Sequence, residues 1–313
     1  MSETTDIVTG AFGFIGRYIT AQLLDAGRRV ITITTHVDKP NPFGRQVEAF
    51  SYNFERPEIL EETLRGVEIL YNTYWVRFDR DATTFARAVE NTKILFRCAA
   101  AAGVKRVVHI SVTHASENSS LPYYRGKALQ EDALRKVGVP YSIIRPTLVF
   151  GKEDILVNNI AWLIRKFPIF PIFGDGRYTI QPIFVGDLAS IAIGCGAKHG
   201  NETMDAIGPE TYSFEELVSL IAKAVSRNIA LVKIPPLLGI SLGKLIGLAV
   251  RDVILTKDEL DGLMADMLTS EQGPNAKTKF SDWLNSNGNN IGISYASELD
   301  RHFRWRPAKP FRG

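Results

Sequence analysis

The feature that most constrains this fold is a glycine-rich turn near the amino terminus, Thr9-Gly10-Ala11-Phe12-Gly13-Phe14-Ile15-Gly16. A short apolar run, Asp6–Thr9, precedes it, and a stretch with helical periodicity, Phe14–Ala26, follows it. Such a turn brings backbone N–H groups close to a pyrophosphate and lets the helix pack closely on the strand. The helix N-terminus adds a partial positive charge that attracts phosphate. We therefore predict a dinucleotide site lined by Gly10, Phe12, Gly13, Phe14, Ile15 and Gly16.

Strand and helix patterns alternate over about the first 150 residues. The runs that predict strands are Val30–Thr34, Val47–Ser51, Glu68–Asn72, Arg106–Ser111 and Tyr141–Arg145. The stretches that predict helices are Pro57–Arg65, Asp81–Ala102 and Tyr124–Val137. This alternation predicts an α/β fold, a Rossmann-like doubly wound parallel sheet with helices on both faces.

The alternation weakens beyond about residue 150, so we expect two regions. Residues 1–150 are predicted to form an NAD(P)-binding Rossmann domain, to which a strand and a helix return from about residues 180–207. Residues 151–313 are expected to form mainly a smaller C-terminal substrate-binding or cap region. Within it, the prolines and glycines of residues 168–176 predict a long loop, and Ser213 with Glu216 predicts a helix capping box.

Composition excludes several classes of function. The formal net charge is only +3, from 37 basic and 34 acidic side chains, so nucleic acid is not expected as the main partner. Two cysteines, Cys98 and Cys195, are too few for a disulfide framework, and the five histidines lack metal-binding spacing, so we predict no metal site. The acidic start, Met1–Asp6, lacks the pattern of a signal peptide, and we expect a cytoplasmic protein.

The most apolar later stretch, Leu237–Val250, contains Lys244 and three glycines. It is too short and too interrupted to span a bilayer, so no transmembrane segment is predicted. The composition favours a buried helix or a surface amphipathic helix over a membrane contact.

The G-x-x-G-x-x-G spacing resembles that of the extended and atypical short-chain dehydrogenase/reductase superfamily. Three further segments are similar to motifs of that superfamily: Ala102–Ser111, Arg145–Gly151 and Gln181–Ala189. Within it, the chain resembles the group related to the nucleotide-binding accessory subunit of respiratory complex I. That likeness rests on Tyr123–Ala128, Phe150–Asp154 and Ile207–Pro209, with weaker support from Leu255–Glu259.

The choice of cofactor is expected to depend on the end of the second strand. An acidic residue there usually holds the ribose 2′-OH of NAD, but the matching position is Thr34. The 2′-phosphate of NADP would meet no carboxylate, and His36, Lys39 and Arg45 could contact it. We therefore favour NADP(H) over NAD(H). The alternative is that Asp38 reaches back to the ribose of NAD.

The superfamily resemblance implies further cofactor contacts by position. Asn53 and Phe54 would flank the adenine, and Thr73 and Tyr74 would line the cofactor at the end of the fourth strand. Pro146 would lie against the cofactor as well.

Tyr123 and Lys127 form the candidate catalytic pair. Their spacing places them on one face of the helix that starts there. A tyrosine pKa of about 10 is too high for easy proton transfer at neutral pH, and a nearby ammonium lowers it. The superfamily uses this Tyr-x-x-x-Lys arrangement for proton transfer, and its lysine also holds the nicotinamide ribose. Tyr124 is the neighbouring alternative, but its spacing to Lys127 is wrong.

The third catalytic position departs from the superfamily pattern. A serine or threonine usually follows the fifth strand and donates a hydrogen bond to the substrate oxygen, but the matching residue here is Val112. Ser111 and Thr113 flank it, and we predict that one of them serves. His114 could polarise a carbonyl instead, although a surface-loop histidine is the plainer interpretation.

Two functions follow from the resemblance. The first is an NADP(H)-dependent oxidoreductase or epimerase that acts on a small carbonyl or hydroxyl substrate by hydride transfer. The second is a catalytically weak or inactive NADP(H)-binding protein with a structural, assembly or redox-sensing role. Superfamily members often pair through helices of the sheet layer, so a homodimer is also expected.

Overall fold

The computed structural model describes residues 4–35, 37–38 and 40–302. Within these residues the chain forms two units. The first contains the described residues up to Pro146 together with Leu188–Asp205. The second contains Thr147–Asp187 and the described part of Ala206–Arg306. Each unit has an apolar core of its own, so each buries its own strands and helices.

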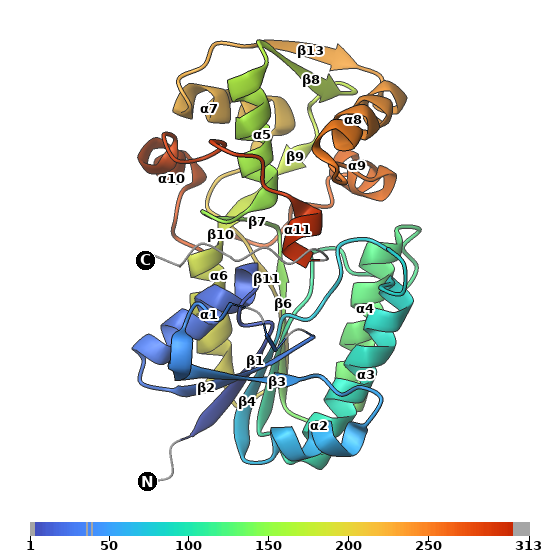
Figure 1. The fold of residues 1–313 in the computed structure, drawn as a ribbon, viewed down its shortest axis with the longest axis vertical. Coiled ribbons are helices and arrows are strands. Elements are labelled where there is room, and N and C mark those ends of the chain that lie inside the picture. Colours follow the sequence, from blue (N-terminus) through green and yellow to red (C-terminus); the bar gives the residue numbers. More distant parts are fainter. Residues whose placement is uncertain (1–3, 36, 39, 303–313) are drawn as a thin grey trace. The chain divides into compact units, whose positions relative to one another are not determined.

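A seven-stranded sheet forms the centre of the first unit, in the order β11-β6-β5-β4-β1-β2-β3 (Figure 1). Its strands are β1 (Thr5–Thr9), β2 (Arg29–Thr34), β3 (Val47–Ser51), β4 (Val67–Asn72), β5 (Arg106–Ile110), β6 (Tyr141–Pro146) and β11 (Glu202–Ala206). Neighbours from β3 to β6 run parallel. The predicted doubly wound parallel sheet is confirmed. The order reverses between β1 and β4, which is where open α/β sheets bind ligands.

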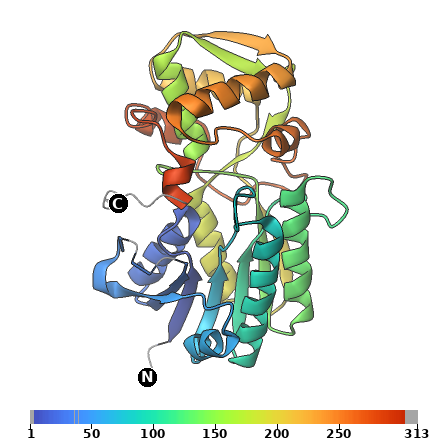
Figure 2. The same ribbon diagram turned by 45° about the vertical axis from the view of Figure 1, so that its right-hand side comes forward.

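Helices cover both faces of this sheet (Figures 1 and 2). One face carries α1 (Phe14–Asp25) and α6 (Val185–Gly196), and the other carries α3 (Phe85–Ala101) and α4 (Pro122–Lys136). Helix α2 (Pro57–Leu64) packs against α3. Because both faces are covered, β1, β2 and β5 are buried at almost every position rather than at alternate ones.

One helix of the first unit begins later than its pattern predicts. Helix α3 starts at Phe85 and not at Asp81, because Asp81 has a left-handed φ of 49° and Thr84 caps the helix. The Thr84 hydroxyl accepts a hydrogen bond from Arg87 N at 3.1 Å, which satisfies a backbone donor of the first turn. A short 3₁₀ helix, Gly44–Gln46, was not predicted.

The second unit contains three two-stranded sheets and six helices among its described residues. The sheets pair β7 (Leu148–Phe150) with β10 (Pro182–Phe184), β8 (Ile169–Phe173) with β13 (Ala230–Ile234), and β9 (Thr179–Ile180) with β12 (Tyr212–Ser213). The helices are α5 (Ile155–Lys166), α7 (Phe214–Ala224), α8 (Pro236–Val250), α9 (Lys257–Met264), α10 (Phe280–Asn287) and α11 (Glu298–His302).

Two local predictions for this unit have opposite outcomes. The capping box at α7 is confirmed, because the Ser213 hydroxyl accepts from Glu216 N and the Glu216 carboxylate accepts from Ser213 N. The long loop over residues 168–176 is wrong, because β8 occupies its centre and pairs with β13. Pro171 fits a two-stranded sheet, since every strand there is an edge strand and need not donate on both sides.

No helix in the described part of the chain is both long and apolar enough to cross a membrane.

Candidate functional site

The glycine turn between β1 and α1 is held by backbone contacts that need glycine. Gly10 has a left-handed φ of +66°, and its carbonyl accepts from Gly13 N at 2.8 Å. A Cβ built at Gly16 would collide with the Gly10 carbonyl, so helix and turn approach each other as closely as backbones can. The Thr32 hydroxyl fixes the turn to the sheet by accepting from Ala11 N at 3.1 Å and donating to Val8 O at 2.7 Å.

This turn fits the pyrophosphate of a dinucleotide. Gly13 is the N-cap residue of α1, no side chain caps that helix, and its first turn contains no acidic residue. The first N–H groups of α1 are therefore left for an anion, and the helix dipole favours one there. A Cβ at Gly13 would also approach the Gly10 carbonyl, so glycine at this position keeps the turn tight beside the first N–H groups of the helix.

The residues predicted to choose between NADP and NAD are described in part. Thr34 ends β2 with its side chain buried, while Asp38 and Arg45 are exposed. His36 and Lys39 lie outside the described residues. Strand β2 therefore ends without a carboxylate. Of the three cations predicted to contact the 2′-phosphate, only Arg45 lies within the described residues.

Phe54, a predicted adenine contact, and Tyr74, predicted to line the cofactor, meet in one aromatic cluster. Phe54 stacks on Tyr52 with ring centroids 4.7 Å apart, and Tyr74 tilts against Phe54 at 5.5 Å. Asn53, which lies between Tyr52 and Phe54 in the sequence, adopts a positive φ of 46°, and its side-chain amide donates to Ser51 O at 3.2 Å. The structure therefore places Phe54 and Tyr74 in one aromatic cluster, with Asn53 next to Phe54 in the chain, and their contacts with the cofactor stay a prediction.

A buried polar network, which the sequence reasoning missed, supports the ends of β1, β4 and β5. The Thr9 hydroxyl accepts from Thr73 N at 2.7 Å and donates to Asn72 Oδ1 at 3.0 Å. The Asn72 amide donates to His109 Nδ1 at 3.0 Å, which places the ring proton on Nε2. Burial and the nearby Lys127 ammonium keep the pKa of His109 well below its usual value, so the ring is neutral. Asn72 and His109 were detectable as polar residues inside apolar strands.

Lys127 lies inside the first unit. Its Nζ donates to the Ile110 carbonyl at 2.8 Å and lies 4.9 Å from the centroid of the Trp75 ring. Burial lowers the pKa of Lys127 to about 7, although the Glu131 carboxylate opposes the shift. This lysine changes its charge near neutral pH, which is the behaviour expected of a group that takes part in proton transfer.

Tyr123 is half-buried one helical turn before Lys127. Its ring meets Trp75 edge to face with centroids 5.8 Å apart, and Phe85 at 6.0 Å. The side chain of Trp75 fits because the facing residue is Gly126, where a Cβ would collide with the indole. The structure therefore places Tyr123 and Lys127 around one aromatic platform.

The hydroxyl of Ser111 already has a partner. It donates to Glu131 Oε1 at 2.5 Å, and the same carboxylate accepts from Arg145 at 2.6 Å and from Arg135 at 2.9 Å. Burial alone would raise the pKa of Glu131, but the hydrogen bonds from Arg145 and Ser111 hold it below its usual value.

The other residues around the third catalytic position are placed as follows. Val112 and Thr113 are buried, and Thr113 N donates to the carbonyl of Pro146 at 3.2 Å. Pro146, the residue predicted to contact the cofactor, is therefore hydrogen-bonded to the loop that follows β5. His114 is exposed and has a left-handed φ of 57°.

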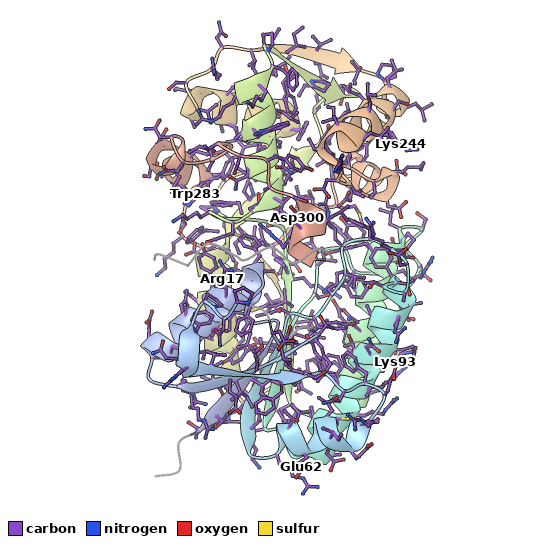
Figure 3. All side chains as sticks on the ribbon, in the orientation of Figure 1. Arg17, Glu62, Lys93, Lys244, Trp283 and Asp300 are labelled. Carbon is purple, nitrogen blue, oxygen red and sulfur yellow. The ribbon has the colours of Figure 1, made fainter. Side chains whose placement is uncertain are left out.

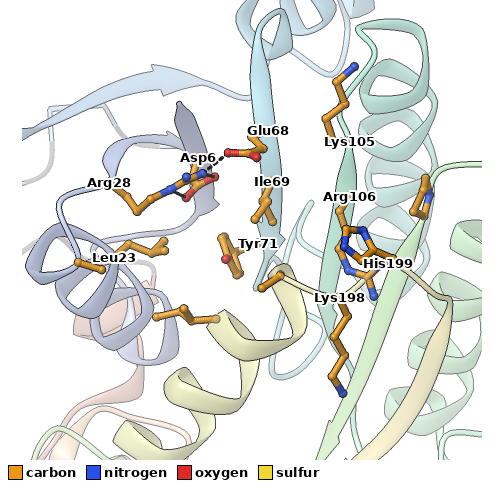
Figure 4. A pocket seen from close by; sticks show the side chains of 15 residues that line it. Asp6, Leu23, Arg28, Glu68, Ile69, Tyr71, Lys105, Arg106, Lys198 and His199 are labelled. Atoms are coloured by element: carbon orange, nitrogen blue, oxygen red, sulfur yellow. Dashed lines mark hydrogen bonds and ion pairs between the residues drawn. The ribbon is translucent and has the colours of Figure 1, made fainter. Parts of the chain in front are cut away.

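A cavity of about 440 Å³ opens at the opposite edge of the sheet (Figure 4). Asp6, Arg28 and Glu68 form an ion-paired group on one side of it, at the amino ends of β1, β2 and β4. Parallel strands place the glycine turn at their carboxyl ends, so this cavity is not the predicted cofactor site.

Comparisons with known proteins agree with this geometry. Residues 10–155 match the family model described as NAD(P)H-binding. A mitochondrial "NADH dehydrogenase [ubiquinone] 1 alpha subcomplex subunit 9" from Rattus norvegicus is 26% identical, covering 87% of this chain and 74% of that protein. The "ceramide reductase" of Caulobacter vibrioides is 24% identical, covering 73% of each.

Among solved structures, a Citrobacter triphenylmethane reductase complexed with NADP(H) superposes with a TM-score of 0.63 at 21% identity, over 85% of this chain and 96% of that one. At this level of identity the likeness shows a shared fold.

Proposed function

We propose that this chain is an NADP(H)-dependent oxidoreductase or epimerase, as its resemblance to the extended and atypical short-chain dehydrogenase/reductase superfamily implies. The match of residues 10–155 to the NAD(P)H-binding family model and the similarity to the complex I subunit support the proposal. Its substrate would be a small carbonyl or hydroxyl compound. The observation that supports catalysis most is Lys127, a buried lysine with a pKa of about 7, one helical turn after Tyr123.

A bound nicotinamide supplies or accepts a hydride. In the direction of reduction, Tyr123 gives its hydroxyl proton to the substrate oxygen as that oxygen gains electrons. Lys127, when protonated, favours the resulting phenolate and so lowers the cost of the transfer. Trp75 and Phe85 keep the Tyr123 ring from swinging away through their edge-to-face contacts. The roles of the glycine turn, Phe54 and Tyr74 are to hold the cofactor.

Three further assignments belong to this proposal. NADP(H) is preferred over NAD(H), since the buried end of β2 offers Thr34 where a carboxylate would repel the 2′-phosphate. The second unit shapes the substrate pocket. The chain pairs into a homodimer through helices of the sheet layer, and analytical ultracentrifugation measures that state directly.

The experiment loads the protein with NADPH, adds carbonyl compounds and nucleotide sugars in turn, and follows the absorbance of the reduced cofactor. We expect at least one substrate to oxidise NADPH. Tyr123→Phe should then lower turnover by roughly 10²- to 10⁴-fold while NADPH still binds. Tyr124→Phe is the matched control, because it removes the neighbouring hydroxyl and should keep turnover. Oxidation that survives Tyr123→Phe would refute the assigned role.

One observation favours a second function, an NADP(H)-binding protein without turnover. The Ser111 hydroxyl is committed to Glu131, and Val112 occupies the usual hydroxyl position. An accessory role like that of the complex I relative would need only binding. If no compound oxidises bound NADPH, and Tyr123→Phe leaves NADPH binding and the biological role intact, this second function replaces the first. If turnover is found, Thr113→Val should reduce it more than Ser111→Ala.

A further inference from the structure

Helix α8 exposes its large apolar side chains and buries its glycines, which is the reverse of what a helix on a water-facing surface normally shows. Ten large apolar side chains are exposed among the described residues, and five of them lie on α8. Leu237, Leu245 and Leu248 are 75%, 65% and 78% exposed. The residues that α8 buries are instead the glycines Gly239, Gly243 and Gly247. A helix that faces only water normally buries its leucines, so this inversion indicates that the outer face meets something else.

The glycine side of α8 explains how the inversion is held. Gly239 lies so close to Phe173 of β8 that a Cβ would collide with the ring, and a Cβ at Gly247 would collide with Asp252 O. Glycines at intervals of four share one face of a helix, so the helix backbone approaches the rest of the unit along that face. The leucines are thereby fixed outward.

The neighbouring sheet continues the apolar surface. Val232 of β13 pairs with Pro171 of β8, and Ala230 pairs with Ile169. Residues directly paired in a sheet share a face, and alternate residues point the same way. This face therefore carries only apolar residues, and Ile169 and Val232 are 55% and 42% exposed. We call these two residues and the exposed leucines of α8 the α8 surface.

The charged residues of α8 and of its C-cap have one sign. Residues 236–251 contain Lys244 and Arg251 and no Asp or Glu, whereas Lys233 of β13 is paired with Glu215 at 3.2 Å. Lys244 projects outward from α8 (Figure 3). The next carboxylate, Asp252, is buried and accepts hydrogen bonds from Glu298 N and Leu299 N, so it does not neutralise this surface.

The length of α8 limits how it can meet a lipid phase. Its 15 residues span about 22 Å, which is shorter than the roughly 30 Å hydrocarbon core of a bilayer. Such a helix can lie in the interface with its leucines among the acyl chains and its lysine at the headgroups. The sequence pattern had favoured a buried or amphipathic surface helix over this contact, and the exposed leucines reverse that preference.

We propose that the α8 surface docks this protein onto an anionic lipid bilayer, lying on it without spanning it. A second copy of the chain fits less well, because a symmetric contact would bring Lys244 and Arg251 of both copies onto one apolar interface. Anionic lipid headgroups complement these cations instead, and each cation near such a surface adds to binding.

The experiment floats the full-length protein with vesicles of phosphatidylcholine alone or mixed with phosphatidylglycerol. We expect binding to the mixed vesicles, and a loss of roughly tenfold or more in Leu245→Ser/Leu248→Ser. Ile293→Ser is the matched control: Ile293 is also 67% exposed in the second unit but lies outside the α8 surface. Lys244→Glu should weaken binding to mixed vesicles and leave any binding to phosphatidylcholine unchanged.

Three outcomes would overturn the proposal. One is the absence of binding to both kinds of vesicle. Another is an equal loss in Ile293→Ser. The third is self-association in solution that Leu245→Ser/Leu248→Ser abolishes while vesicle binding persists, because the α8 surface would then join two copies. The substituted side chains are exposed, so thermal unfolding of these variants should match that of the parent protein and exclude misfolding as the cause.

Discussion

At the scale of single residues, Lys127 shows what spacing can and cannot predict. The interval from Tyr123 to Lys127 selected the lysine from sequence. Its burial, its hydrogen bond to Ile110 O and its position over Trp75 depend on residues distant in the chain. The shifted pKa is therefore a property of the folded unit, and no local pattern contains it.

The pKa of Lys127 predicts a dependence of stability on pH. The unfolded chain binds this proton up to pH 10.5, whereas the folded chain releases it at about pH 7. Between these values the unfolded state holds more protons, so the free energy of unfolding rises with pH, by at most about 1.4 kcal/mol per pH unit. Lys127→Met should remove this rise. Urea unfolding at several pH values between 7 and 10 measures it.

Lys105→Met serves as the control for that measurement, because Lys105 is exposed in the same unit. Its pH dependence of unfolding should follow that of the parent protein. Equal slopes for the parent protein and Lys127→Met would contradict the assigned pKa.

Arg145 makes a second prediction at this scale. It holds the buried Glu131 carboxylate through two hydrogen bonds, at 2.8 and 2.6 Å. Arg145→Met leaves that carboxylate with fewer partners, and removing one member of a buried ion pair costs about 3–5 kcal/mol. Lys136→Met, which breaks the exposed pair with Asp132, should change stability far less. Chemical denaturation compares the two, and similar losses would count against a stabilising role for Arg145.

At the scale of secondary structure, the first half of the chain was largely predictable. Strands β1 to β6 match apolar runs because a sheet covered on both faces leaves little room for polar residues. Predictions failed where a single residue controls a boundary or a distant partner completes a strand. Asp81 and Thr84 move the start of α3, and β13 turns the proline-containing residues around Pro171 into a strand. Pairing between segments about 60 residues apart leaves no local pattern.

The glycine turn gives the prediction that belongs to this scale. Gly16→Ala adds a Cβ against the Gly10 carbonyl, so turn and helix must separate. We expect a stability loss of about 1–3 kcal/mol and weaker NADPH binding. Gly194→Ala is the control: a Cβ there meets nothing within 4 Å, and the residue lies in α6. Unchanged NADPH affinity in Gly16→Ala, measured by calorimetry, would exclude the turn as the pyrophosphate site.

At the scale of the whole molecule, the two units carry different kinds of information in their sequences. The first has a motif that a resemblance can match, and its fold and cofactor class follow from it. The second has its own core, and none of its segments that resemble the superfamily predicts its most unusual feature, the inverted α8, which depends on contacts with Phe173 and Asp252. In the sequence, the leucines of α8 indicated only an apolar stretch, and nothing in the pattern predicted that they are exposed.

The choice of cofactor can be measured through the stability of the whole folded molecule, because a ligand that binds only the native state raises the free energy of unfolding. At a ligand concentration of 100 times Kd the gain is about 2.7 kcal/mol, which raises the melting temperature by a measurable amount. We expect NADP(H) to raise it more than NAD(H) at equal concentration, since Thr34 presents no carboxylate to the 2′-phosphate. Thr34→Asp should reverse that order by repelling the phosphate and binding the ribose hydroxyls of NAD. Thr34→Ser, which adds no charge, should keep it. A larger shift with NAD in the parent protein would mean that another carboxylate, such as Asp38, holds the ribose.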